Sequence, residues 1–111
     1  MSDKKGFAVT RGKGVRLTFA NGYALSVQWG PGNYCENKYG DCSEAGCIQA
    51  GNKGSMDAEI AVFDRQGEFI NLGCDDVAGW VSADKVAALA ARVALATNDK
   101  DVKAAIDELE I

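Results

Sequence analysis

The sequence contains no histidine and only one proline among its 111 residues. Without histidine, neither a Ser/His nor a Cys/His pair can form, so a reactive cysteine needs some other base. The adjacent carboxylates Asp75 and Asp76 point apart in an extended segment, which is poor geometry for a paired acid and base. The sequence also lacks a Walker phosphate-binding pattern and a dinucleotide fingerprint. We therefore expect a binding protein rather than an enzyme, with no catalytic residue and no cofactor.

Long apolar runs are missing as well. No stretch approaches the roughly 20 apolar residues that a bilayer demands, and residues 1–6 are polar and charged, unlike a secretory signal. The length suits one domain spanning residues 1–111, and a hydrophobic content of 47% is ordinary for a globular protein. The sequence thus predicts a soluble cytoplasmic protein with no membrane partner.

The four cysteines lack the spacing of a metal site. Cys35, Cys42, Cys47 and Cys74 are separated by six, four and 26 residues, so no close Cys-x-x-Cys pair exists. Structural zinc sites usually contain such a pair, and disulfides need an oxidising compartment. Reduced thiols and no metal are the interpretation that the spacing favours, with a zinc site or disulfides as the alternatives.

The charge is unevenly distributed. The net charge of −4 argues against a nucleic-acid partner. Residues 1–16 nevertheless hold five basic side chains against one acidic side chain, a balance of +4, whereas residues 98–111 have a balance of −3. A basic first hairpin in an acidic protein suits a small anion, although an ordinary solvated surface has the same composition.

Alternation of apolar and polar residues predicts three strands near the N-terminus, beginning at Phe7, Val15 and Tyr23. Three-residue turns at 12–14 and 20–22 keep one face uniformly apolar. They pair Val9 with Leu17 in the first hairpin and Leu17 with Leu25 in the second. In the second turn, Gly22 takes the left-handed position.

A third hairpin is predicted from 57 to 72, with its loop at 65–67. Val62 then pairs with Ile70, Ile60 with Leu72, and Phe63 lies opposite Phe69. Between the second and third hairpins, the glycine-rich segment 30–56 has no clear periodicity. A loop of that length in a compact domain is usually functional or mobile.

Two helices are predicted after the strands. Ser82 is a plausible N-cap for a helix over about 83–96, and a second helix spans about 99–110. Strands followed by helices favour an α+β fold. We expect an N-terminal antiparallel sheet of about five strands, spanning 7–72, with both C-terminal helices packed on one face.

The sheet face opposite the helices holds the first candidate site. The predicted register aligns Thr10, Arg16 and Ser26 in one row and places Phe63 and Phe69 on the same side. Two aromatic rings beside an arginine can stack a base and pair a phosphate. The alternative is that both phenylalanines fill a subunit interface or pack under the long loop.

Other candidates lie outside this row. In the segment 29–35, Asn33 and Tyr34 offer an amide and a phenol beside two glycines that free backbone N–H groups, although a tight strand exit uses the same residues. Arg92 interrupts an apolar helix, either reaching for solvent or contacting an anionic ligand or partner subunit. We expect Trp80 to be a core anchor.

Three stretches resemble small proteins encoded by bacteriophages. They are Asn21–Cys35 (NGYALSVQWGPGNYC), Asp57–Asp64 (DAEIAVFD) and Gly79–Asp84 (GWVSAD). Together they look most like the first-described Thoeris anti-defence family, which combines an N-terminal antiparallel sheet with two C-terminal helices. The coarse match covers nearly the whole chain, but the loop from Cys35 to Met56 has no counterpart in the family.

The resemblance implies a sponge that works in the cytoplasm of an infected bacterial host cell. Family members bind cyclic nucleotide immune signals, including a cyclic ADP-ribose isomer, and sequester them uncleaved between the subunits of a homo-oligomer. Arginines and an aromatic residue make the main ligand contacts, for which Arg16, Arg92 and Phe63 are the best matches here. A protein that inhibits a host defence protein by direct contact, and a zinc-stabilised structural protein, are the competing hypotheses.

Overall fold

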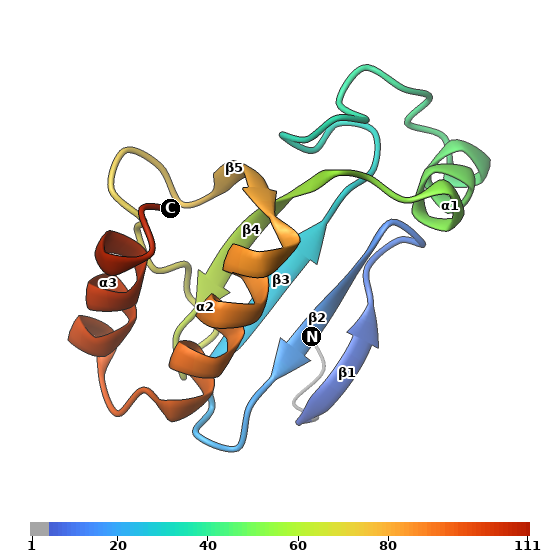
Figure 1. The fold of residues 1–111 in the computed structure, drawn as a ribbon. Coiled ribbons are helices and arrows are strands. Elements are labelled where there is room, and N and C mark those ends of the chain that lie inside the picture. The colour runs from blue at the N-terminus through green and yellow to red at the C-terminus, as the bar shows by residue number, and fades with distance from the viewer. Residues whose placement is uncertain (1–4) are drawn as a thin grey trace.

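The computed structural model describes residues 5–111 as one antiparallel sheet with three helices (Figure 1). The strands are β1 (Gly6–Val9), β2 (Gly14–Thr18), β3 (Ala24–Gln28), β4 (Asp57–Phe63) and β5 (Ala78–Ser82), and the helices are α1 (Glu44–Lys53), α2 (Ala83–Leu95) and α3 (Asp99–Glu108). The strands pair in chain order, so the sheet is a meander of five strands. The α+β prediction is confirmed. Of the basic residues counted in the N-terminal segment, Lys4 lies outside the described residues.

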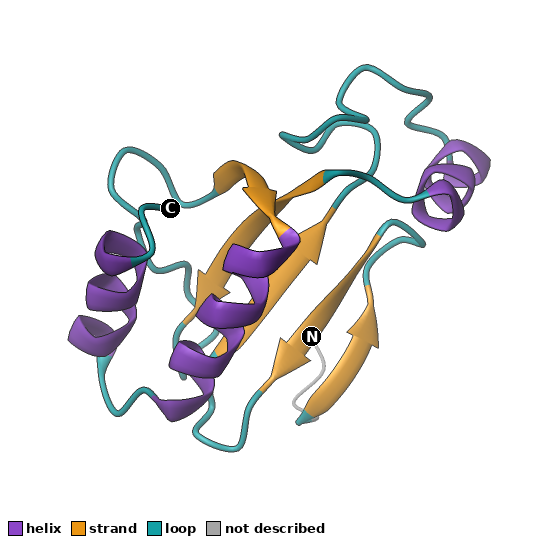
Figure 2. Ribbon diagram, viewed as in Figure 1, coloured by secondary structure: helices purple, strands orange, loops and turns teal. Residues whose placement is uncertain are grey.

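The helices α2 and α3 lie on one side of the sheet, as predicted (Figure 2). The core between the layers joins Leu25 and Ile60 of the sheet to Leu89 and Val93 of α2 and Ile106 of α3, all of them buried. Each such side chain contributes about 1.5–3 kcal/mol by leaving water. Among residues 5–111, none of the helices is both long enough and apolar enough to cross a membrane.

The predicted register of the second hairpin is confirmed. Leu17 pairs with Leu25, and the Phe19 N–H donates to the Tyr23 carbonyl at 2.9 Å. Gly22 has a φ of 93°, a conformation that costs glycine little because it has no Cβ. The apolar face of β2 and β3 therefore points to the helix side.

The turn of this hairpin also ends α2. The Asn21 side-chain amide donates to the carbonyls of Val93 at 2.8 Å and Ala96 at 2.9 Å. Nearby, the Tyr23 hydroxyl donates to Asp99 at the start of α3, at 2.7 Å. Burial, together with this hydrogen bond to Asp99, raises the pKa of Tyr23 above 10.0. One turn thus connects the sheet to both C-terminal helices.

The predicted register of the first hairpin is wrong by two residues. Val9 pairs with Val15 and Phe7 with Leu17, and the turn centres on Gly12 rather than on Lys13. A shift of two keeps every side chain on the same face, so the apolar pattern cannot distinguish the two registers. The helix α1 packs closely on the observed turn, since a Cβ on Gly51 would lie 2.0 Å from the Gly12 carbonyl oxygen.

The predicted fifth strand at 68–72 is only partly correct: the turn before it and the predicted pairings of Phe63 with Phe69 and Val62 with Ile70 are confirmed, but no continuous strand forms there. Phe63 pairs with Phe69 as an isolated bridge, and the Ile70 N–H donates to Val62 at 2.8 Å. Beyond Ile70 the chain leaves the sheet, and Ile60 pairs with Ala78 of β5 instead of Leu72. The sheet therefore extends to residue 82, because Val81 fills the core beside β4.

The segment 30–56 contains a helix that the sequence analysis missed. Ser43 is the N-cap of α1, and its hydroxyl accepts a hydrogen bond from the Gly46 N–H at 3.1 Å. Within α1, only Gly46 and Cys47 are buried. Because so few residues of α1 are buried, its sequence has no apolar stripe with helical periodicity. The predicted N-cap Ser82 is confirmed for α2, and both C-terminal helices lie close to their predicted bounds.

We expect Asn21→Ala to lower the free energy of unfolding by about 1–3 kcal/mol, because it leaves part-buried carbonyls at the end of α2 without donors. Urea denaturation followed by circular dichroism measures the change. Asn52→Ala, at an exposed position in α1, is the matched control and should be neutral or slightly stabilising. Equal losses in the two variants would contradict the capping role.

Candidate ligand-binding site

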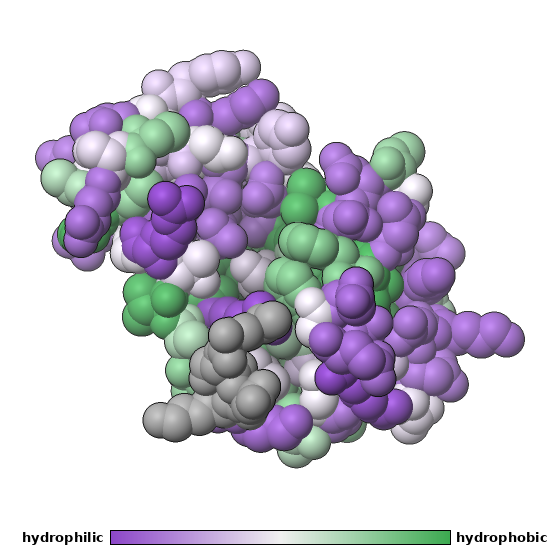
Figure 3. Space-filling view, turned by 180° about the vertical axis from the view of Figure 1, so that it is seen from behind, coloured by the Kyte–Doolittle hydropathy of each residue, from purple (hydrophilic) through white to green (hydrophobic). Residues whose placement is uncertain are grey.

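The sheet face opposite α2 and α3 carries no helix among the described residues, and we call it the outer face (Figure 3). The strand pairing aligns Ala8, Arg16, Ser26 and Ala61 across four strands of this face. The first hairpin's shifted register replaces the predicted Thr10 with Ala8. Seen from this side, the surface is mostly hydrophilic with a smaller apolar area (Figure 3).

Arg16, Phe63 and Phe69 converge on the outer face, as the sequence analysis predicted. The Arg16 guanidinium carbon lies 4.3 Å from the centroid of the Phe63 ring. The Phe63 and Phe69 rings are 4.6 Å apart with an interplanar angle of 40°. Arg16 reaches from β2 across β3 to make this contact, and Ala24 of β3, the strand partner of Phe63, is buried.

This cluster has the chemistry to hold an aromatic anion. A guanidinium whose flat face lies on a ring keeps the N–H groups at its edge available for a phosphate or carboxylate. No carboxylate of the described residues lies within 4.0 Å of Arg16 to neutralise it. Phe69 is 51% exposed, so its ring can stack a base.

Asn33 has a structural role. It is 6% exposed, and its side-chain oxygen accepts from the Gly30 N–H at 3.2 Å. Its amide nitrogen donates to Gln28 at 3.2 Å and to Glu59 at 3.1 Å. These bonds fasten the loop after β3 to the outer face, and they use both amide hydrogens of the Asn33 side chain.

Tyr34 belongs to a second aromatic cluster that the sequence analysis missed. Its ring stacks on Trp80 with centroids 5.7 Å apart, and the Lys38 ammonium lies 4.9 Å from Tyr34, 5.2 Å from Tyr39 and 5.9 Å from Trp80. We call Tyr34, Tyr39 and Trp80 the aromatic cage. Lys38 and Tyr39 lie in a glycine-rich loop without periodicity, so no sequence pattern predicts that they lie beside Tyr34 and Trp80.

The prediction that Trp80 anchors the core is wrong. Its side chain is 56% exposed, and its φ of 51° lies in a region that bulky residues rarely adopt. This conformation costs on the order of 1–2 kcal/mol. The Trp80 N–H donates to the Tyr34 carbonyl at 2.8 Å, and Val81 rather than Trp80 enters the core.

The two clusters lie at opposite ends of the outer face. Glu59, which binds the Tyr34 N–H at 3.0 Å, is four residues before Phe63 on β4. Four residues of a strand span about 13 Å. The structure therefore brings three of the predicted residues together and places Asn33 and Tyr34 elsewhere on the same face.

Arg92 lies in the helix layer, on the other side of the sheet from Arg16. Its guanidinium forms a salt bridge of 2.6 Å with Glu108 of α3, and both side chains are substantially exposed. Exposed pairs of this kind contribute little stability. Within a single chain, the two predicted arginines do not converge on one site.

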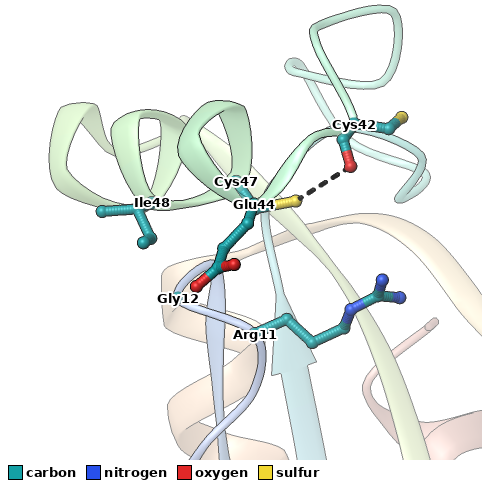
Figure 4. A pocket seen from close by; sticks show the side chains of 6 residues that line it. All are labelled: Arg11, Gly12, Cys42, Glu44, Cys47 and Ile48. Atoms are coloured by element: carbon teal, nitrogen blue, oxygen red, sulfur yellow. Dashed lines mark hydrogen bonds between the residues drawn. The ribbon is translucent and has the colours of Figure 1, made fainter.

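A pocket of about 420 Å³ lies between α1 and the first turn (Figure 4). Its lining residues include Arg11, Glu44, Cys42 and Cys47. The Cys47 thiol points to the Cys42 carbonyl oxygen, 3.8 Å away, whereas the Cys42 thiol points away from Cys47 (Figure 4). All four cysteines are free, and no group of three or more metal-ligating residues gathers anywhere in residues 5–111.

A second hollow, of about 460 Å³, opens beside α2 on the helix side of the sheet, and we call it the apolar groove. Leu17 and Val27 belong to the sheet part of its lining, and Val86 belongs to α2. Close to it in the sheet, Phe7 and Val9 of β1 are 89% and 77% exposed, because α2 packs on β3, β4 and β5. The helix side of the sheet therefore leaves apolar side chains of β1 and of the groove open to solvent.

We expect a thiol reagent such as Ellman's reagent to react with two of the four cysteines rapidly in the folded protein. Cys42 and Cys74 are exposed, whereas Cys35 and Cys47 are buried, and burial also raises the pKa of Cys35. Since the thiolate is the reactive form, buried thiols react slowly. The double variant Cys42→Ser/Cys74→Ser should lose the fast phase, and four fast thiols in the wild type would contradict the described packing.

Comparison with known proteins does not assign this chain to a family. No protein-family model matches the chain, and no curated protein or solved structure shows significant similarity to it.

Proposed function

We propose that this protein binds a small anionic ligand with an aromatic ring on its outer face and releases it unaltered. The observation that carries this proposal is the convergence of Arg16 on Phe63, at 4.3 Å, beside the exposed ring of Phe69. The guanidinium edge pairs with a phosphate while a base stacks on the exposed ring.

A nucleotide satisfies both requirements of this cluster, since it carries phosphate and base a short distance apart. The three side chains supply a cation and aromatic faces but no nucleophile or general base, so their chemistry supports capture without cleavage. The resemblance to the Thoeris anti-defence family agrees with this mechanism. We therefore propose a phage counter-defence sponge for a cyclic nucleotide immune signal, such as a cyclic ADP-ribose isomer.

Self-association belongs to the same proposal. The exposed Phe7 and Val9 continue the apolar face of the sheet to the edge strand β1, whose outer backbone groups have no strand partner among the described residues. A second copy that covers this surface removes several apolar side chains from water and satisfies the open edge. The same surface supports a second candidate function, direct inhibition of a host defence protein.

Titration calorimetry against a panel of cyclic nucleotides and cyclic ADP-ribose isomers tests the ligand proposal. We expect binding with a Kd on the order of 1 μM or tighter, with the ligand recovered intact after heat denaturation. Arg16→Ala should weaken binding about 10- to 100-fold, because it removes a charge-assisted hydrogen bond.

Arg92→Ala is the matched control, since it removes the same charge from the helix layer and an exposed ion pair. It should fold normally and keep its affinity. Loss of binding in Arg92→Ala with full binding in Arg16→Ala would overturn the outer-face site. Turnover of any nucleotide by the purified chain would contradict the sponge.

Analytical ultracentrifugation tests the self-association proposal. We expect the wild type to sediment as an oligomer and Phe7→Glu to shift it to the monomer, because a charge cannot be buried there unpaired. Leu95→Glu, at an apolar residue that is 79% exposed elsewhere, should leave the oligomer intact. A monomeric wild type that captures a defined host protein would favour direct inhibition instead.

A further inference from the structure

The aromatic cage at the other end of the outer face has no place in the proposed function. Its three rings are unusually open to solvent: Tyr34 is 39% exposed, Trp80 56% and Tyr39 92%. Tyr34 and Trp80 stack on each other, and the Lys38 ammonium lies within 5.9 Å of the centroids of both rings and of Tyr39. A cation within about 6 Å of a ring centroid is attracted by the ring's quadrupole.

The backbone of the cage is held by hydrogen bonds. Tyr34 is fixed through its N–H to Glu59 at 3.0 Å and through its carbonyl to the Trp80 N–H at 2.8 Å. Gly79 permits this approach, because a Cβ there would lie 2.5 Å from the Tyr34 Cβ. The Lys38 N–H donates to the Cys35 carbonyl at 3.1 Å. The backbone at Tyr34 and Trp80 is therefore held by bonds that do not involve the Lys38 side chain.

Trp80 adds a second, independent observation. It adopts a positive φ while presenting its ring mainly to solvent, so burial of the ring does not explain the conformation. Backbone strain at an exposed aromatic residue is a feature of ligand sites. In this conformation the indole stacks on Tyr34 and lies 5.9 Å from the Lys38 ammonium.

The stretch of chain that contains Tyr34 and Tyr39 is acidic, which favours a cation over an anion. Residues 30–60 hold five acidic side chains against two basic ones, a balance of −3. Glu59 lies next to Tyr34, and Asp57 accepts from the Glu36 N–H at 2.8 Å in the same loop. This environment contrasts with that of Arg16 at the far end of the face, where the ligand proposed above is negative.

We propose that Tyr34, Tyr39 and Trp80 form a binding site for an alkylated ammonium ion, and that Lys38 occupies this site when the ligand is absent. The rings attract the positive charge and the N-alkyl groups pack on their faces. Lys38 is a built-in competitor, because its ammonium must leave before another cation can enter. This site is separate from the Arg16 cluster, and its occupancy does not depend on the nucleotide proposal.

Choline and its uncharged isostere 3,3-dimethyl-1-butanol are the probes that test this inference. Binding is followed by the indole N–H signals in 15N–1H correlation spectra, where Trp29 serves as an internal reference outside the cage. We expect Lys38→Ala to bind choline about tenfold more tightly than the wild type does, and about tenfold more tightly than it binds the isostere. Tyr34→Ala in the Lys38→Ala background keeps the Trp80 indole as the reporter and the backbone hydrogen bonds of residue 34, and it should abolish choline binding.

Lys53→Ala is the matched control, because it removes the same charge from an exposed position in α1 and should leave choline affinity at the wild-type value. Lys38→Gln removes the charge but keeps most of the side-chain length, so it tests whether Lys38→Ala fails only because the rings close on the space left by the lysine. The inference is overturned if neither Lys38 variant prefers choline to the isostere, or if Lys53→Ala raises affinity as much as Lys38→Ala does.

Discussion

The turn between β2 and β3 is the constraint on which the rest of the structure depends. Gly22 sets the register that puts Leu17 and Leu25 on the helix side, and therefore sends Arg16 and Ser26 to the outer face. A slip of one residue would exchange the two faces. Because Asn21 of the same turn binds the last carbonyls of α2, the register and the position of the helix layer are fixed together.

The outer face carries two clusters in which a cation lies over aromatic rings, and their surroundings give them opposite preferences. Arg16 stacks on Phe63 without a carboxylate of the described residues beside it, so its N–H edge favours an anion. The cage around Lys38 lies in an acidic stretch of the chain, which favours a cation. About 13 Å of β4 separates the two, so the two proposed sites do not overlap.

Incomplete helix cover explains the apolar surface on the other side of the sheet. The helix α2 packs on β3, β4 and β5, so Phe7 and Val9 of β1 stay exposed and the apolar groove stays open. A single chain leaves this surface in water, whereas a second copy or another protein would bury it. The face that holds the charged clusters and the face suited to association are thus opposite sides of one sheet.

The sequence by itself determined the α+β class, the second hairpin with its register, the two C-terminal helices and the convergence of Arg16 with Phe63 and Phe69. Local patterns carry these features, because alternation fixes faces and turn residues fix pairing. Only the tertiary structure decided the register of the first hairpin, the choice of 78–82 as the fifth strand and the position of α1. These three features depend on contacts between segments that are distant in the chain, which a local pattern does not contain. The aromatic cage also depends on such a contact, because Trp80 packs on a loop that lies more than forty residues earlier in the sequence.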